Sequence, residues 1–212
     1  MLSNFITRIR NAVLDRTLLE FTASAKNRSL YLTFDDGPSP EVTRKLLDTL
    51  DKYNAKATFF VIGREVEKYP DIAKQISEAG HTIGNHSFSH PPFGRLSPSQ
   101  QDDEVEKAQR AIETHLNISS PLFRVPRGRW SVPMLLRMKK RKIRCIHWAV
   151  DSLDYDDKDA ERITQRIIDN GIKPGQILLF HDDSPLCLEV MDLLLPKLIT
   201  MNFNLAAMDY HQ

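Results

Sequence analysis

Five polar clusters along the chain contain side chains that could bind a metal or transfer protons. Two neighbouring carboxylates, Asp35 and Asp36, precede two histidines four positions apart, His86 and His90. Two histidines and one carboxylate suit Zn²⁺ or a similar divalent cation, because such a set leaves positions open for water and substrate. A bound cation lowers the pKa of its water and polarises a carbonyl oxygen. The carboxylate that stays off the metal can then accept a proton from that water.

The other three clusters add a cationic side chain and a second acid–base group. Arg124 lies in the third cluster, Asp151 and Asp154 form the fourth, and His181 begins the fifth. A histidine on the far side of the site could protonate a leaving amine. Together the clusters predict metal-assisted hydrolysis of an amide or an ester.

Each cluster also has an ordinary structural interpretation when it is taken alone. An Asp-Asp-Gly-Pro run is typical of a turn. Two histidines with this spacing can share one face of a helical turn, but such a pair is more often incidental. Arg124 and Asp151 could form a structural ion pair, and His181 could be a satisfied histidine. We favour catalysis because all five clusters are expected at one edge of the fold.

That expectation comes from the elements predicted around the clusters. Short apolar runs predict strands, and amphipathic stretches between them predict helices. Each cluster follows the carboxyl end of a strand, which is where βα barrels and open α/β sheets build their sites. The predicted strands are Ser29–Phe34, Ala57–Ile62, Thr82–Asn85, Leu122–Val125, Ile143–Val150, Ile177–Phe180 and Phe203–Ala207. The predicted helices are Pro40–Tyr53, Arg64–Ala79, Pro98–Leu116, Val132–Arg141, Lys158–Asn170 and Leu186–Thr200.

Strands that alternate with helices predict an α/β fold with a mainly parallel sheet. A chain of 212 residues suits a small, incomplete βα barrel or an open doubly wound sheet, since a full eightfold barrel takes about 250 residues. Gly80 and Gly171 each follow a predicted helix, where glycine is favoured because it adopts positive φ. Ser97 and Ser131 stand where helix N-caps are expected.

The N-terminal residues predict a separate amphipathic segment. Apolar residues between Met1 and Phe21 recur at helical spacing and are interrupted by Arg8, Arg10 and Arg16, so neither a secretory signal nor a membrane span is expected. We expect a helix that packs on the domain, or a basic helix on an anionic membrane surface. The expected boundaries are 1–28 for this segment and 29–212 for a single catalytic domain. Because no secretory signal is expected, we expect a cytoplasmic location. If the helix binds an anionic membrane surface, the protein lies at the inner face of that membrane.

Charge and cysteine content narrow the class of protein. The 29 basic and 28 acidic residues leave a formal net charge of +1, which argues against a nucleic-acid partner. Cys145 and Cys187 are too few for a disulfide scaffold and are expected to be buried thiols. Nine basic and no acidic residues lie between Thr114 and Val150, and an acidic block begins at Asp151. The basic block could complement a helix C-terminus, or face anionic lipids or a diphosphate-linked sugar.

The ordered motifs resemble those of the polysaccharide deacetylases, the NodB-homology type of carbohydrate esterase family four. The resemblance implies a distorted, incomplete (β/α)7-type barrel. It also implies a metal-dependent de-N-acetylase that acts on an N-acetylated amino sugar in an oligo- or polysaccharide. The motifs are Thr33-Phe34-Asp35-Asp36-Gly37-Pro38, His86-Ser87-x-x-His90, Arg124-x-Pro126-x-Gly128, Asp151-Ser152-x-Asp154 and Leu179-x-His181, in the family's order.

The same resemblance implies roles for individual residues. Asp35 resembles the general base, and Arg124 resembles the residue that orients it. His181 resembles the general acid, with Asp151 holding and tuning it. The backbone N–H of Arg127 would help to hold the oxyanion. The implied metal ligands are Asp36, His86 and His90, the implied metal is Zn²⁺ with Co²⁺, Mn²⁺ or Ni²⁺ as alternatives, and the implied substrate contacts are Pro126, Tyr155 and Leu179, the last lining a pocket for the acyl methyl.

Two residues depart from the family's pattern and bear on the substrate. Arg127 stands where an aromatic residue is usual, so its side chain offers a cation in the groove. Tyr155 stands where Trp is usual, and it can still wall the site. Two alternatives stay open. One is a deacetylase or deformylase of a polyprenyl-phosphate-linked amino sugar in envelope polysaccharide assembly, and the other is a non-catalytic carbohydrate-binding relative.

Overall fold

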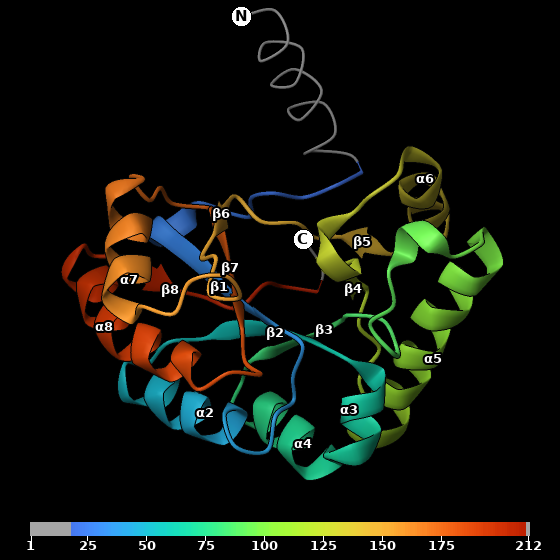
Figure 1. Ribbon diagram of the computed structural model, residues 1–212, viewed down its shortest axis with the longest axis horizontal. Coiled ribbons are helices and arrows are strands. Elements are labelled where there is room, and N and C mark those ends of the chain that lie inside the picture. The colour runs from blue at the N-terminus through green and yellow to red at the C-terminus, as the bar shows by residue number, and fades with distance from the viewer. Residues whose placement is uncertain (1–17, 211–212) are drawn as a thin grey trace, which may run out of the picture.

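The architecture is an open barrel of parallel strands with helices on its outside (Figure 1). The computed structural model describes residues 18–210. The strands follow the order β5-β4-β3-β2-β1-β7-β6, and β8 pairs with the start of β1. This arrangement confirms the predicted incomplete βα barrel. The strands are β1 Ser29–Asp35, β2 Ala57–Val61, β3 Thr82–Asn85, β4 Leu122–Phe123, β5 Arg144–Cys145, β6 Val150–Asp151, β7 Ile177–His181 and β8 Asn204–Leu205.

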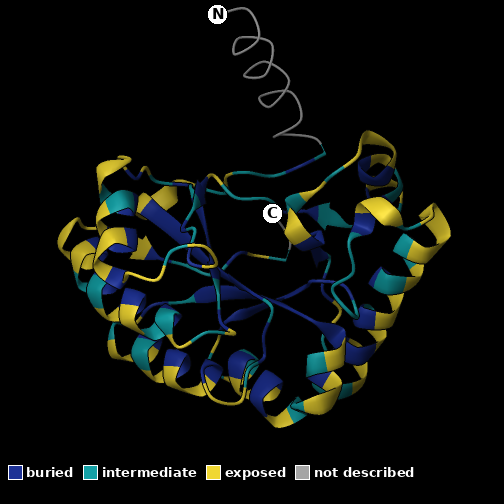
Figure 2. Ribbon diagram, viewed as in Figure 1, coloured by how far each residue is buried: buried dark blue, intermediate teal, exposed yellow. Residues whose placement is uncertain are grey.

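Helices connect most of the successive strands and cover the outer face of the barrel (Figure 1). Their outward faces are exposed, whereas the strands between them are buried (Figure 2). The α-helices are α2 Thr43–Lys52, α3 Gly63–Lys68, α4 Pro70–Glu78, α5 Pro98–Leu116, α6 Val132–Lys140, α7 Ala160–Asp169 and α8 Leu186–Thr200, and the 3₁₀ turns are η1 Lys26–Arg28, η2 Phe93–Arg95 and η3 Pro126–Gly128.

Strand β1 shows how the sequence places functional side chains inside the barrel. Successive side chains of a strand point to opposite faces. Leu30, Leu32 and Phe34 belong to the main core beneath the helices. Thr33 and Asp35 therefore point the other way, into the barrel, where both are buried. All residues of β1 are buried, as is typical of a parallel strand covered on both faces.

The helix ends follow the local sequence signals closely. Ser97 caps α5 by accepting from the backbone N–H of Gln100, whose side chain in turn accepts from the Ser97 backbone N–H. This reciprocal capping box satisfies two donors that the helix itself cannot pair. Ser131 caps α6, and the glycines that follow α4 and α7 have positive φ, at 78° for Gly80 and 72° for Gly171.

Two predicted elements are each divided in two in the structure. The single helix expected over Arg64–Ala79 is two helices, α3 and α4, with a break at Tyr69. Tyr69 precedes Pro70, whose ring disfavours the helical conformation of the residue before it. The strand expected over Ile143–Val150 is two short strands, because β5 pairs with β4 at one edge of the sheet and β6 pairs with β7 at the other. The residues between them cross the open side of the barrel.

Residues 18–23 also cross this open side. Glu20 forms a bridge with Ile146, and Thr22 forms one with Gln176. The described residues 18–25 contain no helix, so the predicted helix is wrong at its end near Phe21. The rest of that prediction, residues 1–17, lies outside the described residues. Within residues 18–210 no helix is long and apolar enough to cross a membrane.

Candidate active site

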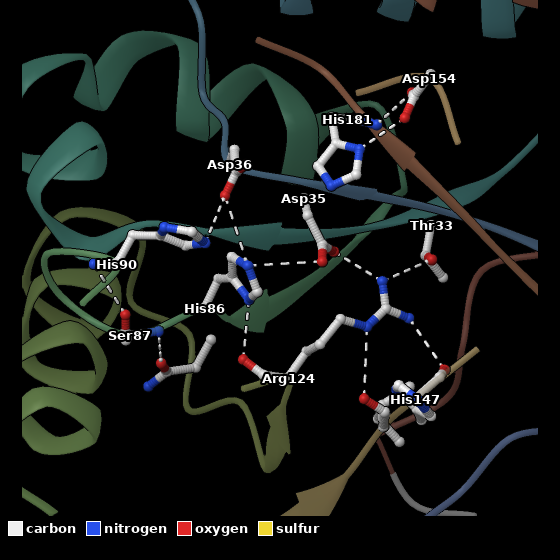
Figure 3. A network of polar contacts seen from close by, with 12 residues as sticks. Thr33, Asp35, Asp36, His86, Ser87, His90, Arg124, His147, Asp154 and His181 are labelled. Atoms are coloured by element: carbon white, nitrogen blue, oxygen red, sulfur yellow. Dashed lines mark hydrogen bonds and ion pairs between the residues drawn. The ribbon is translucent and has the colours of Figure 1, made fainter. Parts of the chain in front are cut away.

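The innermost part of the site is a buried ion pair between Asp35, at the end of β1, and Arg124, just after β4. Arg124 Nη1 donates to Asp35 Oδ1 over 2.7 Å and to Thr33 Oγ1 over 2.8 Å (Figure 3). The other guanidinium nitrogens donate to the carbonyl oxygens of Ile146 and His147. The Arg124 side chain is fully buried, and partners on both sides of the barrel hold it. It therefore fixes the orientation of the Asp35 carboxylate.

Asp35 and Asp36 have oppositely perturbed ionisation. Burial raises the pKa of Asp35, but Arg124, His86 and His181 more than offset burial and bring that pKa below its ordinary value. For Asp36 the balance is reversed, because burial and the neighbouring Asp35 carboxylate raise its pKa to about 7. The Asp35 carboxyl group is thus ionised at neutral pH, whereas the charged form of Asp36 needs a positive partner.

Asp36, His86 and His90 form a candidate metal site. One ligand atom from each lies within 4.8 Å of the others. Asp36 Oδ1 is 3.5 Å from His86 Nε2 and 3.3 Å from His90 Nε2 (Figure 3). The structure thus brings together the three residues that the sequence predicts as ligands.

The hydrogen bonds around these groups fit a cation. His86 Nδ1 lies 2.8 Å from the carbonyl oxygen of Arg124, which only accepts, so Nδ1 carries the proton. Burial lowers the pKa of His86 to about 4, so the ring is neutral and Nε2 presents a lone pair toward Asp36. Asp36 Oδ1 is buried and has no hydrogen-bond donor among the described residues. Two acceptors that face each other are stabilised by a cation between them, and a backbone carbonyl on the second nitrogen is usual for metal-binding histidine.

The two histidines lie on a loop after β3 rather than on a helix. Ser87 and His90 have left-handed backbone conformations, with φ of 68° and 55°. Glu104 of α5 holds the loop by accepting from the backbone N–H groups of Phe88 and Ser89 and from the Ser89 hydroxyl. The four-residue spacing therefore brings the two histidines together through a turn that is anchored to a neighbouring helix.

His181, at the end of β7, is the second acid–base group. It pairs in register with Asp35 across β1 and β7, and its ring points toward the two carboxylates (Figure 3). His181 Nδ1 lies 2.7 Å from Asp154 Oδ1. Burial lowers the pKa of His181, but the hydrogen bond and charge of Asp154, with Asp35 and Asp36, raise it to about 9. The ring is therefore protonated at neutral pH.

The predicted partner of His181 was Asp151, and the structure corrects this assignment. Asp151 Oδ1 instead accepts from the backbone N–H of Leu153 over 2.9 Å. Leu153 has a left-handed backbone conformation with φ of 57°, so the chain turns between the two acidic residues. The turn brings Asp154 to the imidazole, and Asp151 remains in the wall of the cavity.

A cavity of about 550 Å³ opens over these groups, within the size range of small-molecule sites. Arg127, Tyr155 and Leu179 line it. Pro126 does not line this cavity. It is buried and lines an adjoining cavity of about 390 Å³, which shares Arg127 with the first.

Sequence reasoning missed two residues that shape the site. Trp148 lines the main cavity and packs against His147, with 3.9 Å between the two ring centroids. It lies in the segment predicted as a strand, where an aromatic residue indicates core. Glu104 anchors the histidine loop, but an acidic residue on an amphipathic helix carries no signal that separates it from a solvent-exposed one.

A candidate metal site beside a base and a protonated acid, at the mouth of an open βα barrel, defines a hydrolase. The model of the polysaccharide deacetylase family matches residues 22–146, more than half of the chain. A chitooligosaccharide deacetylase of Bradyrhizobium sp. (strain ANU 289) is 38% identical over 159 residues, which cover 74% of this chain and 72% of the relative. The chain belongs to the polysaccharide deacetylase family, as its motifs indicate.

Solved structures agree with this assignment. A peptidoglycan N-acetylglucosamine deacetylase in complex with 4-naphthalen-1-yl-N-oxidanyl-benzamide has a TM-score of 0.87 at 28% identity, covering 93% of this chain and 94% of its own. A CE4 family pseudoenzyme from Bacillus anthracis has a TM-score of 0.81 at 28% identity, covering 89% of this chain and 66% of its own. The fold is shared with a pseudoenzyme, so catalysis depends on the residues of the site.

Proposed function

We propose that the protein is a metal-dependent de-N-acetylase, which hydrolyses the acetamide of an N-acetylated amino sugar in an oligo- or polysaccharide and releases acetate. One observation carries the proposal. Asp35 and His181, neighbours across β1 and β7, have pKa values perturbed in opposite directions beside the candidate metal site. A base that is ionised and an acid that is protonated at the same pH are what amide hydrolysis requires.

Asp36, His86 and His90 would hold the metal, for which Zn²⁺ is our first choice and Co²⁺, Mn²⁺ or Ni²⁺ are alternatives. When bound, a divalent cation supplies Lewis acidity and makes water a nucleophile at neutral pH. The residues of the chain supply the remaining chemistry.

Asp35 accepts the proton of the attacking water, and Arg124 keeps its carboxylate ionised and oriented. His181 donates a proton to the amine nitrogen as the C–N bond breaks, while Asp154 stabilises its charged form. The backbone N–H of Arg127 donates to the oxygen of the tetrahedral intermediate. Leu179, which is buried at the cavity wall, receives the acyl methyl.

The test is acetate release from a panel of N-acetylated substrates by the purified, Zn²⁺-loaded protein. The panel contains chitooligosaccharides, N-acetylated glycan strands and lipid-linked amino sugars. We expect release of one acetate per free amine formed, and loss of turnover in His181→Ala with the metal still bound.

Failure to release an acyl group from any substrate in the panel, with the metal shown to be bound, would contradict the proposal. That result would favour a non-catalytic carbohydrate-binding relative. Retention of full activity in His181→Ala would contradict the assignment of the acid.

A second candidate keeps the site and changes the substrate to a polyprenyl-phosphate-linked amino sugar at the cytoplasmic face of a membrane, with acetyl or formyl as the acyl group. Exposed Arg127 and Arg129 at the cavity favour it, as does the basic amphipathic sequence before Leu18. The test compares liposomes with and without anionic lipid. Binding that needs anionic lipid, and that falls in the full chain carrying Arg8→Glu and Arg10→Glu, supports the candidate, and absence of binding contradicts it.

A further inference from the structure

The arginines of the basic block between Arg124 and Arg144 differ in their partners. Arg137, Arg141 and Arg144 each pair with an acidic side chain. Arg127 and Arg129 are exposed, and within residues 18–210 their guanidinium groups make no hydrogen bond or ion pair. Four of the six arginines in the block are therefore paired with acidic side chains, whereas Arg127 and Arg129 are not paired among the described residues.

Arg127 and Arg129 line the same cavity, together with a third arginine. Arg127 and Arg129 line both the main cavity and the adjoining cavity, so the two cavities meet at these residues. Arg95, from η2, also lines the adjoining cavity. It too is exposed and lacks a side-chain partner in the described part of the chain.

The adjoining cavity has no acidic residue in its described lining, which consists of Pro92, Phe93, Gly94, Arg95, Pro126, Arg127 and Arg129. Three like charges around one hollow repel each other unless an anion lies between them. By contrast, the lining of the main cavity includes acidic residues, among them Asp151, Asp154 and Asp183.

The helix dipole does not account for these arginines. Lys139 and Lys140 lie at the C-terminus of α6, where cations are stabilised. Arg127 and Arg129 precede the N-cap Ser131, so they lie near the N-terminus of the same helix, where cations are disfavoured. The dipole of α6 therefore explains Lys139 and Lys140, whereas it disfavours Arg127 and Arg129.

We propose that Arg95, Arg127 and Arg129 form an anion-binding subsite beside the acetamide site. The group that it binds is a carboxylate or phosphate one sugar away from the hydrolysed acetamide. A guanidinium group binds either oxyanion with two parallel hydrogen bonds. This inference rests on the proposed deacetylase function and narrows its substrate to an acidic amino-sugar compound.

The experiment compares kcat/KM on three probes of matched size. One is a neutral chitooligosaccharide, the second alternates N-acetylglucosamine with a uronic acid, and the third carries a phosphodiester next to N-acetylglucosamine. We expect at least one acidic probe to be preferred by about tenfold or more. The preference should shrink between about 50 and 500 mM salt, because exposed charges are screened. The two acidic probes distinguish a carboxylate from a phosphate.

Arg95→Gln combined with Arg129→Gln should reduce the ratio of acidic to neutral kcat/KM by about tenfold. The matched control is Arg110→Gln, because Arg110 is an exposed arginine of α5 outside both cavities. It should leave the ratio unchanged. The melting temperature of each variant shows that the fold is intact.

Equal kcat/KM on all probes, or a preference that survives in the double variant, overturns the inference while neutral turnover still supports the deacetylase. If no probe is hydrolysed, the deacetylase proposal fails, and calorimetric titration with the same probes decides the subsite. Tighter binding of an acidic probe that is lost in Arg95→Gln/Arg129→Gln supports it, and equal binding of all probes overturns it.

Discussion

Asp154 contributes most to keeping His181 in the protonated form that we assign to it, with smaller contributions from Asp35 and Asp36. The pKa of His181 is raised to about 9 despite burial because Asp154 accepts from Nδ1. A general acid must be protonated in the active form, so its activity is present below its pKa and falls as the pH rises through that value. The alkaline limb of the pH profile is therefore a direct readout of this contact.

Asp154→Asn should move that alkaline limb toward lower pH by about one unit or more, because the charge that stabilises the imidazolium is lost. The pH dependence of kcat measures the shift. Asp151→Asn is the matched comparison, since Asp151 lines the same cavity without contacting the His181 ring. A larger shift in Asp151→Asn than in Asp154→Asn would restore the assignment made from the motif.

Loss of the Arg124 side chain should lower the stability of the fold strongly. Arg124→Met leaves the buried Asp35 carboxylate without its ion-pair partner, and breaking such a pair costs about 3–5 kcal/mol. Denaturant unfolding measures the loss, with exposed Arg110→Met expected within about 0.5 kcal/mol of the original chain. A cost below about 1 kcal/mol in Arg124→Met would show that the pair does not hold the site.

The pH dependence of this contribution has a defined sign. The folded-state pKa of Asp35 is depressed, so the pair stabilises the fold above the unfolded-state pKa of 3.8. That contribution is lost as the pH falls through the lower, folded-state value.

At the scale of elements, the candidate metal ligands depend on how a loop is attached to a helix. Asp36 follows β1, whereas His86 and His90 lie on the loop after β3. Glu104 of α5 accepts from three donors of that loop, and the capping box at Ser97 starts the helix that carries Glu104. The geometry of the ligands therefore depends on a residue that does not touch the metal.

Glu104→Ala should weaken metal binding by about 10–100-fold, which is the usual effect of removing a residue that orients metal ligands. Competition with a chromophoric chelator measures the affinity. Glu113→Ala is the control, because Glu113 lies on the exposed side of the same helix. Equal affinities for the two variants would show that the loop holds its shape without Glu104.

At the scale of the whole molecule, the barrel is open between its two edge strands. Strands β5 and β6 do not pair with each other, and Glu20 and Thr22 bridge residues near the gap. Arg144 adds two hydrogen bonds to the Glu20 carboxylate, of 2.8 and 2.7 Å. The site lies at the mouth of this barrel, so a ligand that joins β1 to the β3 loop should stabilise the fold.

Removal of the metal with a chelator should lower the melting temperature, and Zn²⁺ should restore it. A ligand at about 100 times its Kd stabilises by about 2.7 kcal/mol, or roughly 5–10 °C for a domain of this size. Differential scanning calorimetry measures the change. The variant His86→Ala/His90→Ala should not respond, and a full response from it would mean that the metal binds elsewhere.

The sequence by itself determined which chemical groups this protein has and which strand ends carry them. Asp35, His86, Arg124 and His181 follow or end apolar strands, and parallel strands bring their carboxyl ends to one edge whatever the details of packing. Most helix ends were predictable for the same local reason, because caps, prolines and glycines act on the residues beside them.

The tertiary structure alone decided the pairings. Asp151 and Asp154 are both aspartates in the same motif. The left-handed backbone conformation of Leu153 between them decides that Asp154 is the one that contacts His181. In the sequence the basic block is one run of charge, yet acidic residues far along the chain pair with Arg137 and Arg144, whereas Arg127 and Arg129 at the cavity have no such partner within residues 18–210. Such contacts join residues far apart in the chain, so their strength depends on distance and burial, which no local pattern contains.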